Sequence, residues 1–210
     1  MRSFRWLAAL LVLSAWAADS PLDTLLKAVE TRYNRAGTLQ IEFNEAYTLP
    51  NRPSRTEVGL LSLRKPGKMR WDYTKPLGKL FLSDGKSIYL YTPANKQVEK
   101  MKLKESDDMR APLAFLLGKL KFSKEFQNIT SRQEGSLTII AAQPKVDSLP
   151  YTDVEFVVTP DARIQRVKVA GYDKSVLEFT FSNEKLNPAL NSKMFDFQMP
   201  PGAQLVEGGQ

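Results

Sequence analysis

The chain contains neither cysteine nor histidine among its 210 residues. Without cysteine it cannot form thiol nucleophiles, disulfides, zinc ribbons or iron–sulfur clusters. Without histidine it lacks the base of serine–histidine catalysis and the commonest ligand of catalytic metal sites. Only carboxylate, lysine, serine or tyrosine chemistry remains for an enzyme. We therefore expect a protein that is not an enzyme and that uses no cofactor and no metal.

Local enzyme motifs are also missing. Asp84-Gly85-Lys86-Ser87 looks like the end of a phosphate-binding loop, but Leu80 stands where that loop requires its first glycine. A tight hairpin turn explains the Asp-Gly pair without a ligand. An exported hydrolase that uses serine or carboxylate groups is the weakest alternative, because no local motif supports one.

Residues 1–18 have the pattern of a signal peptide. Arg2 and Arg5 precede an apolar run from Leu7 to Trp16, and Ala15-Trp16-Ala17 fits a cleavage site of small residues. The run is too short to span a bilayer comfortably, although a buried N-terminal helix or a short anchor is the alternative. We expect export and a soluble mature chain, 19–210, that forms one domain.

The mature chain begins with a helical pattern and continues mainly as strands. Residues 21–35 place an apolar residue at every third or fourth position, with Ser20 as a cap and Pro21 in the first turn. About 10–11 short segments then alternate apolar and polar residues at hairpin spacing. A short helix is predicted at 111–117, and 195–199 is a candidate for a last strand. The simplest fold is mainly β, with one large antiparallel sheet that curls and helices that cover its concave face.

Three stretches of the chain contain short motifs in a characteristic order. The first runs from Gly59 to Tyr73 and contains a basic-Pro turn and an aromatic-rich strand. The second, Leu82 to Pro93, contains Ser-Asp-Gly-Lys and Tyr-Thr-Pro, and the third joins Phe195-Asp196-Phe197 to Pro200-Pro201-Gly202. In their order and spacing these stretches resemble the outer-membrane lipoprotein carrier protein (LolA) family, and the resemblance runs from the signal peptide to the end of the chain.

The resemblance implies an unclosed antiparallel β-barrel with a helical lid over an apolar cavity. It also implies a periplasmic shuttle that takes acylated lipoproteins from an inner-membrane ATP-driven extractor and delivers them to the outer membrane, possibly through an outer-membrane lipoprotein receptor. The alternative is a periplasmic lipid-binding or lipoprotein-sensing module of the same fold without a transport role. The formal net charge of +7 is dispersed along the chain, so nucleic acid is not an expected partner, and we expect a monomer.

Apolar residues on two helices and on the sheet are the candidates for contact with acyl chains, with ordinary core packing as the alternative for each. The predicted lid residues are Leu22, Leu25, Leu26, Val29, Leu113, Phe115, Leu116 and Leu117. The predicted concave-face residues are Leu39, Ile41, Phe43, Leu61, Leu63, Met69, Trp71, Ile88 and Leu90.

Two positions carry further implications of the resemblance. Family members commonly have an arginine before the proline of the basic-Pro turn, and that arginine holds the empty lid closed; the matching residue here is Lys65. Lysine lacks the planar fork of arginine, so the clasp is predicted to be weaker or to be made by another residue. An ordinary solvated turn lysine is the alternative. Met69 stands where the family has an aromatic residue, close to the surface used for partner handover.

Overall fold

A continuous 12-stranded sheet dominates the computed structural model, which describes residues 20–102, 120–146 and 149–207. The strand order is β12-β6-β5-β4-β3-β2-β1-β11-β10-β9-β8-β7, and the pairs are antiparallel except for β12 with β6. The strands are β1 (Thr38–Thr48), β2 (Arg55–Arg64), β3 (Lys68–Lys75), β4 (Leu80–Asp84), β5 (Ser87–Thr92), β6 (Gln97–Lys102), β7 (Phe126–Glu134), β8 (Leu137–Pro144), β9 (Tyr151–Val158), β10 (Ile164–Gly171), β11 (Val176–Leu186) and β12 (Gln204–Glu207).

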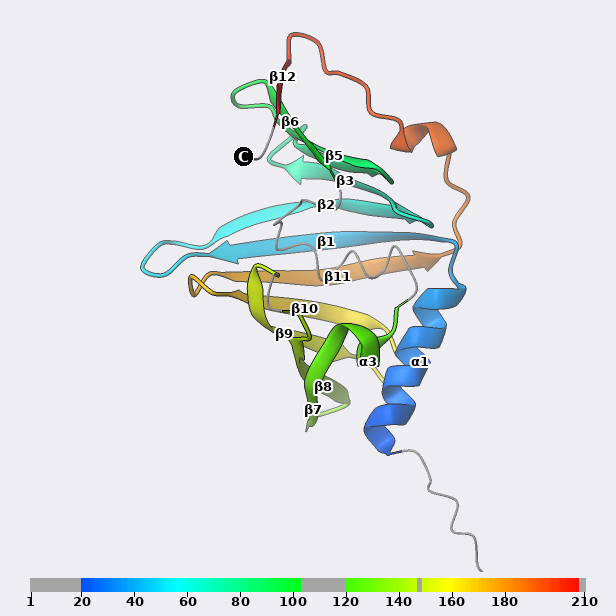
Figure 1. Ribbon diagram of the computed structural model, residues 1–210. Helices are drawn as coiled ribbons and strands as arrows, with labels where there is room; N and C mark the ends of the chain where they lie inside the picture. The colour runs from blue at the N-terminus through cyan, green and yellow to red at the C-terminus, as the bar shows by residue number, and fades with distance from the viewer. Residues whose placement is uncertain (1–19, 103–119, 147–148, 208–210) are drawn as a thin grey trace, which may run out of the picture.

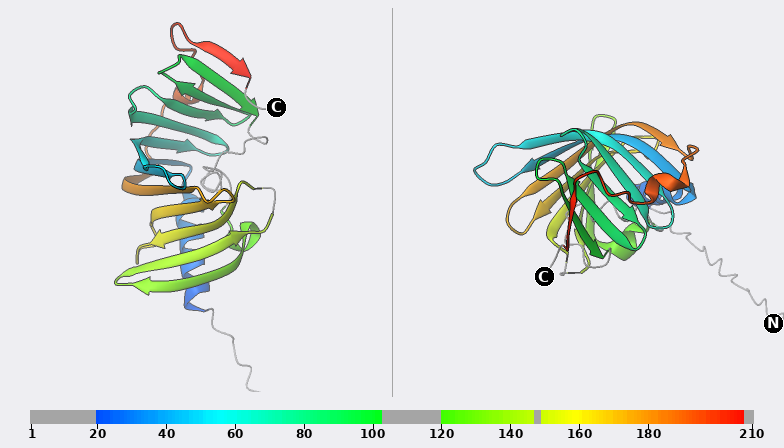
Figure 2. Two further views of the ribbon diagram at one scale, coloured as in Figure 1. Left: turned by 90° about the vertical axis from the view of Figure 1, so that its left-hand side faces the viewer. Right: turned by 90° about the horizontal axis from the view of Figure 1, so that it is seen from above.

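The sheet curves strongly without closing into a barrel (Figure 1, Figure 2). Its two edges, β12 and β7, are not paired with each other. The predicted mainly β, unclosed antiparallel architecture is therefore confirmed, with 12 strands in place of the predicted 10–11. No helix in the described ranges has the length and apolar character needed to cross a membrane.

Helix α1 (Pro21–Arg35) forms where the sequence predicts it. The Ser20 hydroxyl accepts a hydrogen bond from the Asp23 amide at 3.1 Å, and Pro21 occupies the first turn, where its missing N–H costs nothing. Leu26, Val29 and Tyr33 are its buried residues and join the core of the sheet. A second helix, α3 (Phe122–Glu125), lies in front of β8 (Figure 1) and was not predicted. The predicted helix 111–117 lies outside the described residues.

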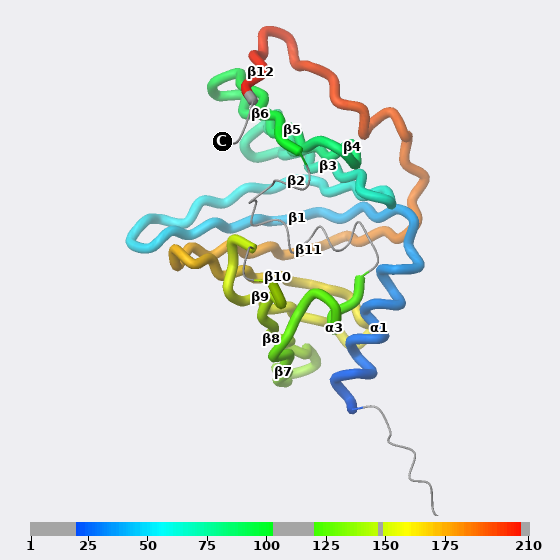
Figure 3. The backbone as a smooth tube through the Cα atoms, in the orientation of Figure 1, coloured from blue at the N-terminus to red at the C-terminus, as the bar shows by residue number. Residues whose placement is uncertain are grey.

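The chain after β11 forms a strap that runs past β3, β4 and β5 to the edge of the sheet at β12 (Figure 3). The strap contains a short 3-10 helix, η3 (Ser192–Phe195), and β12 extends the sheet beyond β6. Arg70 on β3 donates a 2.9 Å hydrogen bond to the Met194 carbonyl, and the Phe197 ring stacks on Tyr89 at 4.2 Å. The prediction of a strand at 195–199 is wrong. Phe195 is fully buried as the end of η3, and the strap turns its aromatic residues toward the sheet rather than pairing with a strand.

Candidate functional site

The concave face of the sheet carries one continuous apolar cluster. Strand alternation directs every second residue of β1, β2 and β3 to this face. The register aligns Leu39 with Leu63 and Ile41 with Leu61, and it continues the second row to Trp71 on β3. The predicted acyl-chain residues that are buried in this cluster, each at most 9% exposed, are Leu26, Val29, Leu39, Ile41, Phe43, Leu61, Leu63, Met69, Trp71 and Ile88.

Three further candidates lie at the edge of the cluster. Leu22, Leu25 and Leu90 are partly buried and pack against it. Leu113, Phe115, Leu116 and Leu117 lie outside the described residues. The structure therefore brings all the described candidates to one apolar surface. Contact with an acyl chain stays a prediction for each of them.

Aromatic rings form the centre of the cluster. The Phe43 ring meets Trp71 edge-on at 4.7 Å and Tyr73 edge-on at 5.1 Å, and Trp71 lies 5.3 Å from Phe179 on β11. Phe43 lies opposite Gly59 on β2, which has no side chain in the way of the ring. Because aromatic pairs prefer such edge contacts, the rings hold the middle of the curved sheet together.

Sequence reasoning missed the half of the cluster that comes from β7–β11 and α3. Phe122, Phe126 and Phe156 pack edge-on or tilted at 5.3–6.0 Å, and Val167 and Val169 on β10 are fully buried. The signal was available, because the sequences of β9, β10 and β11 contain the alternating stretches Val-Glu-Phe, Val-Lys-Val and Leu-Glu-Phe-Thr-Phe. It did not show that these strands face the same interior as β1–β5.

Met69 does not lie at a surface. Its side chain is 3% exposed on the concave side of β3, so it belongs to the packed cluster. Its neighbour across the ladder is Leu63, which is also buried. In this structure Met69 therefore has a place in the interior, where the flexible thioether fits irregular space, and a role in handover stays a prediction.

Lys65 ties the β2–β3 turn to the last turn of α1. Its Nζ donates to the Tyr33 carbonyl oxygen at 2.6 Å, and its own amide donates to the Gly37 carbonyl at 2.9 Å. Partial burial lowers the pKa of the Lys65 ammonium. A helix C-terminus carries partial negative charge, so this cation stabilises the helix end. The position is the one that a clasp on α1 needs, and the clasp role remains a prediction.

Replacement of Lys65 by methionine tests that role. Methionine keeps the apolar stem but leaves the Tyr33 carbonyl without its donor, so we expect amides of the last turn of α1 to exchange with solvent roughly tenfold faster, the equivalent of one hydrogen bond to a charged group. Lys65→Arg is the rescue variant and should restore slow exchange. Unchanged exchange in Lys65→Met would identify Lys65 as an ordinary turn residue.

A second set of contacts holds α1 to the other half of the sheet. The Tyr33 hydroxyl donates to Glu184 Oε2 at 2.7 Å and accepts from the Ile164 amide at 2.9 Å. Arg32 contacts the same carboxylate through Nε at 3.0 Å and Nη2 at 2.5 Å. Burial, together with the Glu184 charge, raises the pKa of the Tyr33 phenol well above its usual range, so the hydroxyl keeps its proton. Nothing in the local sequence predicted these partners, which lie more than 100 residues apart.

Contacts of α1 with the segment that leads to α3 complete its attachment. The Asn34 side chain bonds both backbone groups of Leu120, at 2.7 and 2.6 Å, and Glu30 accepts from the Phe122 amide at 2.8 Å. Helix α1 is thus fixed at its C-terminal half and along one side. Near its N-terminus, Leu22 and Leu25 are only partly buried against the cluster.

Comparison with known proteins gives consistent results along the chain. A family model described as "Outer membrane lipoprotein carrier protein LolA" matches residues 34–198. The outer-membrane lipoprotein carrier protein of Chromobacterium violaceum is 28% identical over 172 residues, which cover 81% of this chain and 82% of that one. The protein of the same name from Pseudomonas aeruginosa is 27% identical over 212 residues, with 99% and 100% coverage. Among solved structures, an uncharacterized conserved protein of Thermus thermophilus shares the fold at a TM-score of 0.53 and 13% identity, covering 90% of this chain and all of that one.

Proposed function

Because this chain belongs to the LolA family of outer-membrane lipoprotein carrier proteins, we propose that it takes lipoproteins from the inner membrane, shields their acyl chains from water and delivers them to the outer membrane. The cargo would be acylated lipoproteins, the donor an ATP-driven extractor in the inner membrane, and the acceptor a receptor at the outer membrane. The protein would act in the periplasm. Residues 1–18 would direct its export as a signal peptide and would then be removed.

The observation that carries this proposal is the continuous apolar cluster on the concave face. Each methylene that an acyl chain removes from water is worth about 0.8 kcal/mol, so ten of them contribute about 8 kcal/mol. A lipoprotein in free solution would have to expose several such chains. An apolar surface built from both halves of the sheet, with α1 against it, offers the missing environment.

Binding and release both require the cluster to open. Its members are at most 9% exposed, so an acyl chain must displace a covering element or a side chain. The cost of that opening reduces the net affinity, which a carrier that releases its cargo without ATP needs. Helix α1 is the described element best suited to move, because separable polar contacts at its C-terminal half hold it to the sheet.

The first experiment is incubation of the purified mature protein with spheroplasts. We expect an acylated lipoprotein to appear in the soluble fraction in a one-to-one complex with the protein. Release of lipid without lipoprotein would instead favour a lipid-binding module without a transport role. If nothing is released and nothing co-purifies, the carrier function is wrong for this chain.

A matched pair of variants on α1 connects this activity to the apolar surface. Leu25 packs against the cluster, whereas its neighbour Thr24 is exposed on the opposite side of the helix. Leu25→Glu removes about half of the free energy that burial of one leucine contributes to the complex. We therefore expect the affinity for a dipalmitoyl lipopeptide to fall about tenfold. Thr24→Glu adds the same charge to the same turn and should bind normally. Equal binding by both variants would exclude this face of α1 from the acyl site.

A further inference from the structure

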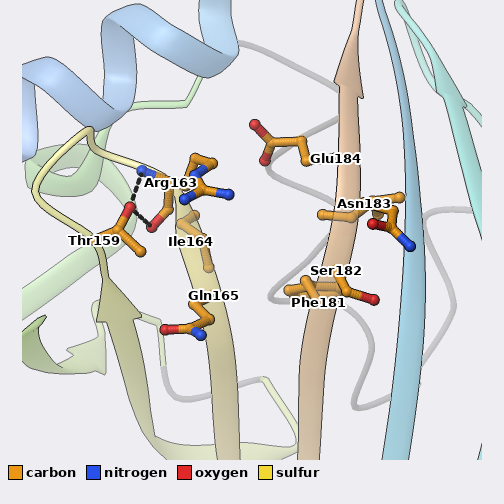
Figure 4. A pocket seen from close by; sticks show the side chains of 9 residues that line it. Thr159, Arg163, Ile164, Gln165, Phe181, Ser182, Asn183 and Glu184 are labelled. Atoms are coloured by element: carbon orange, nitrogen blue, oxygen red, sulfur yellow. Dashed lines mark hydrogen bonds between the residues drawn. The ribbon is translucent and has the colours of Figure 1, made fainter.

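Strands β10 and β11 separate at the end that lies under α1. They pair from Arg166 with Thr180 to Ala170 with Val176, and no pair follows beyond Arg166 and Thr180. Strand β10 continues to Ile164 beside β9 only, and β11 continues to Leu186 beside β1 only. Figure 4 shows the two strands diverging at this point. Every second residue of a strand directs its N–H and C=O to one side, so backbone groups of both strands face the opening.

Both strands carry a β-bulge beside the opening. In β10, Ile164 pairs with Val158 and Arg166 with Val157, so Gln165 is an extra residue. In β11, two residues between Ser182 and Lys185, namely Asn183 and Glu184, lie opposite a single residue of β1. Asn183 has a φ of 53°, in the left-handed region. Bulges redirect side chains and end strand pairing, often beside functional sites, so the opening is built by both strands rather than left by chance.

The opening between the two strands contains a cavity of about 230 Å³. At its inner end lie Ile41 and Phe181, which belong to the apolar cluster. At its outer end lie the exposed residues Gln165 and Ser182. Arg163, just before β10, and Glu184 on β11 project toward the gap (Figure 4), and Tyr33 bonds Ile164 and Glu184 on the side of α1. The slot, defined by these lining residues, therefore has polar residues at the surface and two members of the apolar cluster, Ile41 and Phe181, in its lining.

We propose that this slot binds an extended peptide, namely the segment of an acylated protein that directly follows its lipid-bearing residue. The inference rests on the proposed function and names a second contact with the same cargo. A carrier that keeps the acyl chains inside and the folded cargo outside must let a peptide pass between them. Each residue of that peptide brings one N–H and one C=O that need partners.

The slot supplies partners of the right chemistry. Strand edges beside the opening bind an extended peptide by strand addition, and the exposed Gln165 amide offers both donors and an acceptor. The exposed Arg163 guanidinium, which also donates to Asp161 at 2.9 Å, adds further donors. The adjoining Phe181 and Ile41 place the lipid-bearing end of such a peptide next to the apolar cluster. The pairs β1–β11 and β9–β10 continue beyond Arg166 and Thr180, so the slot is a local break in the hydrogen bonding between β10 and β11.

Disulfide trapping locates the peptide, because the chain has no cysteine of its own. The probe is a dipalmitoyl lipopeptide with a cysteine three residues after the lipid-bearing one, mixed with Gln165→Cys under mild oxidation. Lys168→Cys, exposed on the same strand where β10 and β11 are paired, is the control. We expect the Gln165→Cys disulfide to form at least about tenfold faster, since bound partners have far higher effective concentrations than free ones. Equal rates at the two positions would overturn the slot.

A slot-filling variant gives an independent readout. Gln165→Trp should weaken binding of the lipopeptide about tenfold, the equivalent of one or two backbone hydrogen bonds, and leave binding of free palmitate unchanged. Equal weakening of both ligands, or no weakening of either, would overturn the proposal. If the wild-type protein binds palmitate but no lipopeptide, the carrier function fails as well. Normal lipopeptide binding without preferred trapping at Gln165→Cys refutes the slot alone.

Discussion

Replacement of Gly59 by alanine is expected to destabilise the fold by about 3 kcal/mol or more, near the upper end of the cost of overpacking a core. A Cβ at this position would lie 2.2 Å from the Asp72 carbonyl oxygen and 2.8 Å from Cζ of Phe43. The carbonyl belongs to the β2–β3 ladder and cannot move away without breaking it. The Phe43 ring cannot move either, because it is 2% exposed and packs between Trp71 and Tyr73.

Gly37→Ala is the matched control for that substitution. The nearest atom to a Cβ at Gly37 is the side-chain oxygen of Asn187 at 4.0 Å, so the methyl group has room. Urea denaturation of the two variants should therefore separate them clearly, with Gly37→Ala close to wild type. Equal stability of the two variants would mean that β2 and β3 can shift apart at Gly59. The aromatic centre of the concave face would then be adaptable rather than fixed.

The order of helix and strands was predictable because it rests on local chemistry. The cap at Ser20, the hairpin turn at Asp84-Gly85 and the alternation in β1 each act over a few residues. The Asp84 side chain accepts hydrogen bonds from the amides of Lys86 and Ser87 at 2.8 Å, so a turn rather than a phosphate explains this motif. The prediction of a strand at 195–199 was wrong because contacts with Tyr89 and β3, which are distant in the chain, position this segment.

The candidate site was predictable only on one side. Alternation placed Leu39, Ile41 and Trp71 on a common face, and their burial agrees with that placement. The contacts around Tyr33 were not predictable, since they join α1 to residues 131 and 151 positions away. The slot depends on two bulges, and one extra residue in a strand leaves no mark in the hydrophobic pattern that would distinguish it from a longer turn.

The second large effect is expected from Arg32→Met, which should destabilise the protein by about 3 kcal/mol. The Glu184 side chain is 4% exposed and accepts two hydrogen bonds from Arg32, at 3.0 and 2.5 Å. Without Arg32, a buried carboxylate keeps only the Tyr33 hydroxyl among the partners described for it. A buried charge without its counter-ion costs much more than the intact pair contributes.

Glu184→Gln is expected to cost less than Arg32→Met. Glutamine still accepts a hydrogen bond from the Tyr33 hydroxyl. The Arg32 side chain is 25% exposed, so it keeps its access to solvent and its 3.5 Å hydrogen bond to the Asp161 carbonyl. The double variant should therefore be more stable than Arg32→Met alone, with a coupling energy of about 1–2 kcal/mol in a double-mutant cycle. Arg132→Met is the control and should change stability little, because the Arg132 side chain is 54% exposed where it pairs with Glu134 on β7 and Glu155 on β9. If the stability losses of the two single variants simply add in the double variant, Arg32 and Glu184 act separately. The end of α1 would then be held by Tyr33 and Lys65 without help from the ion pair.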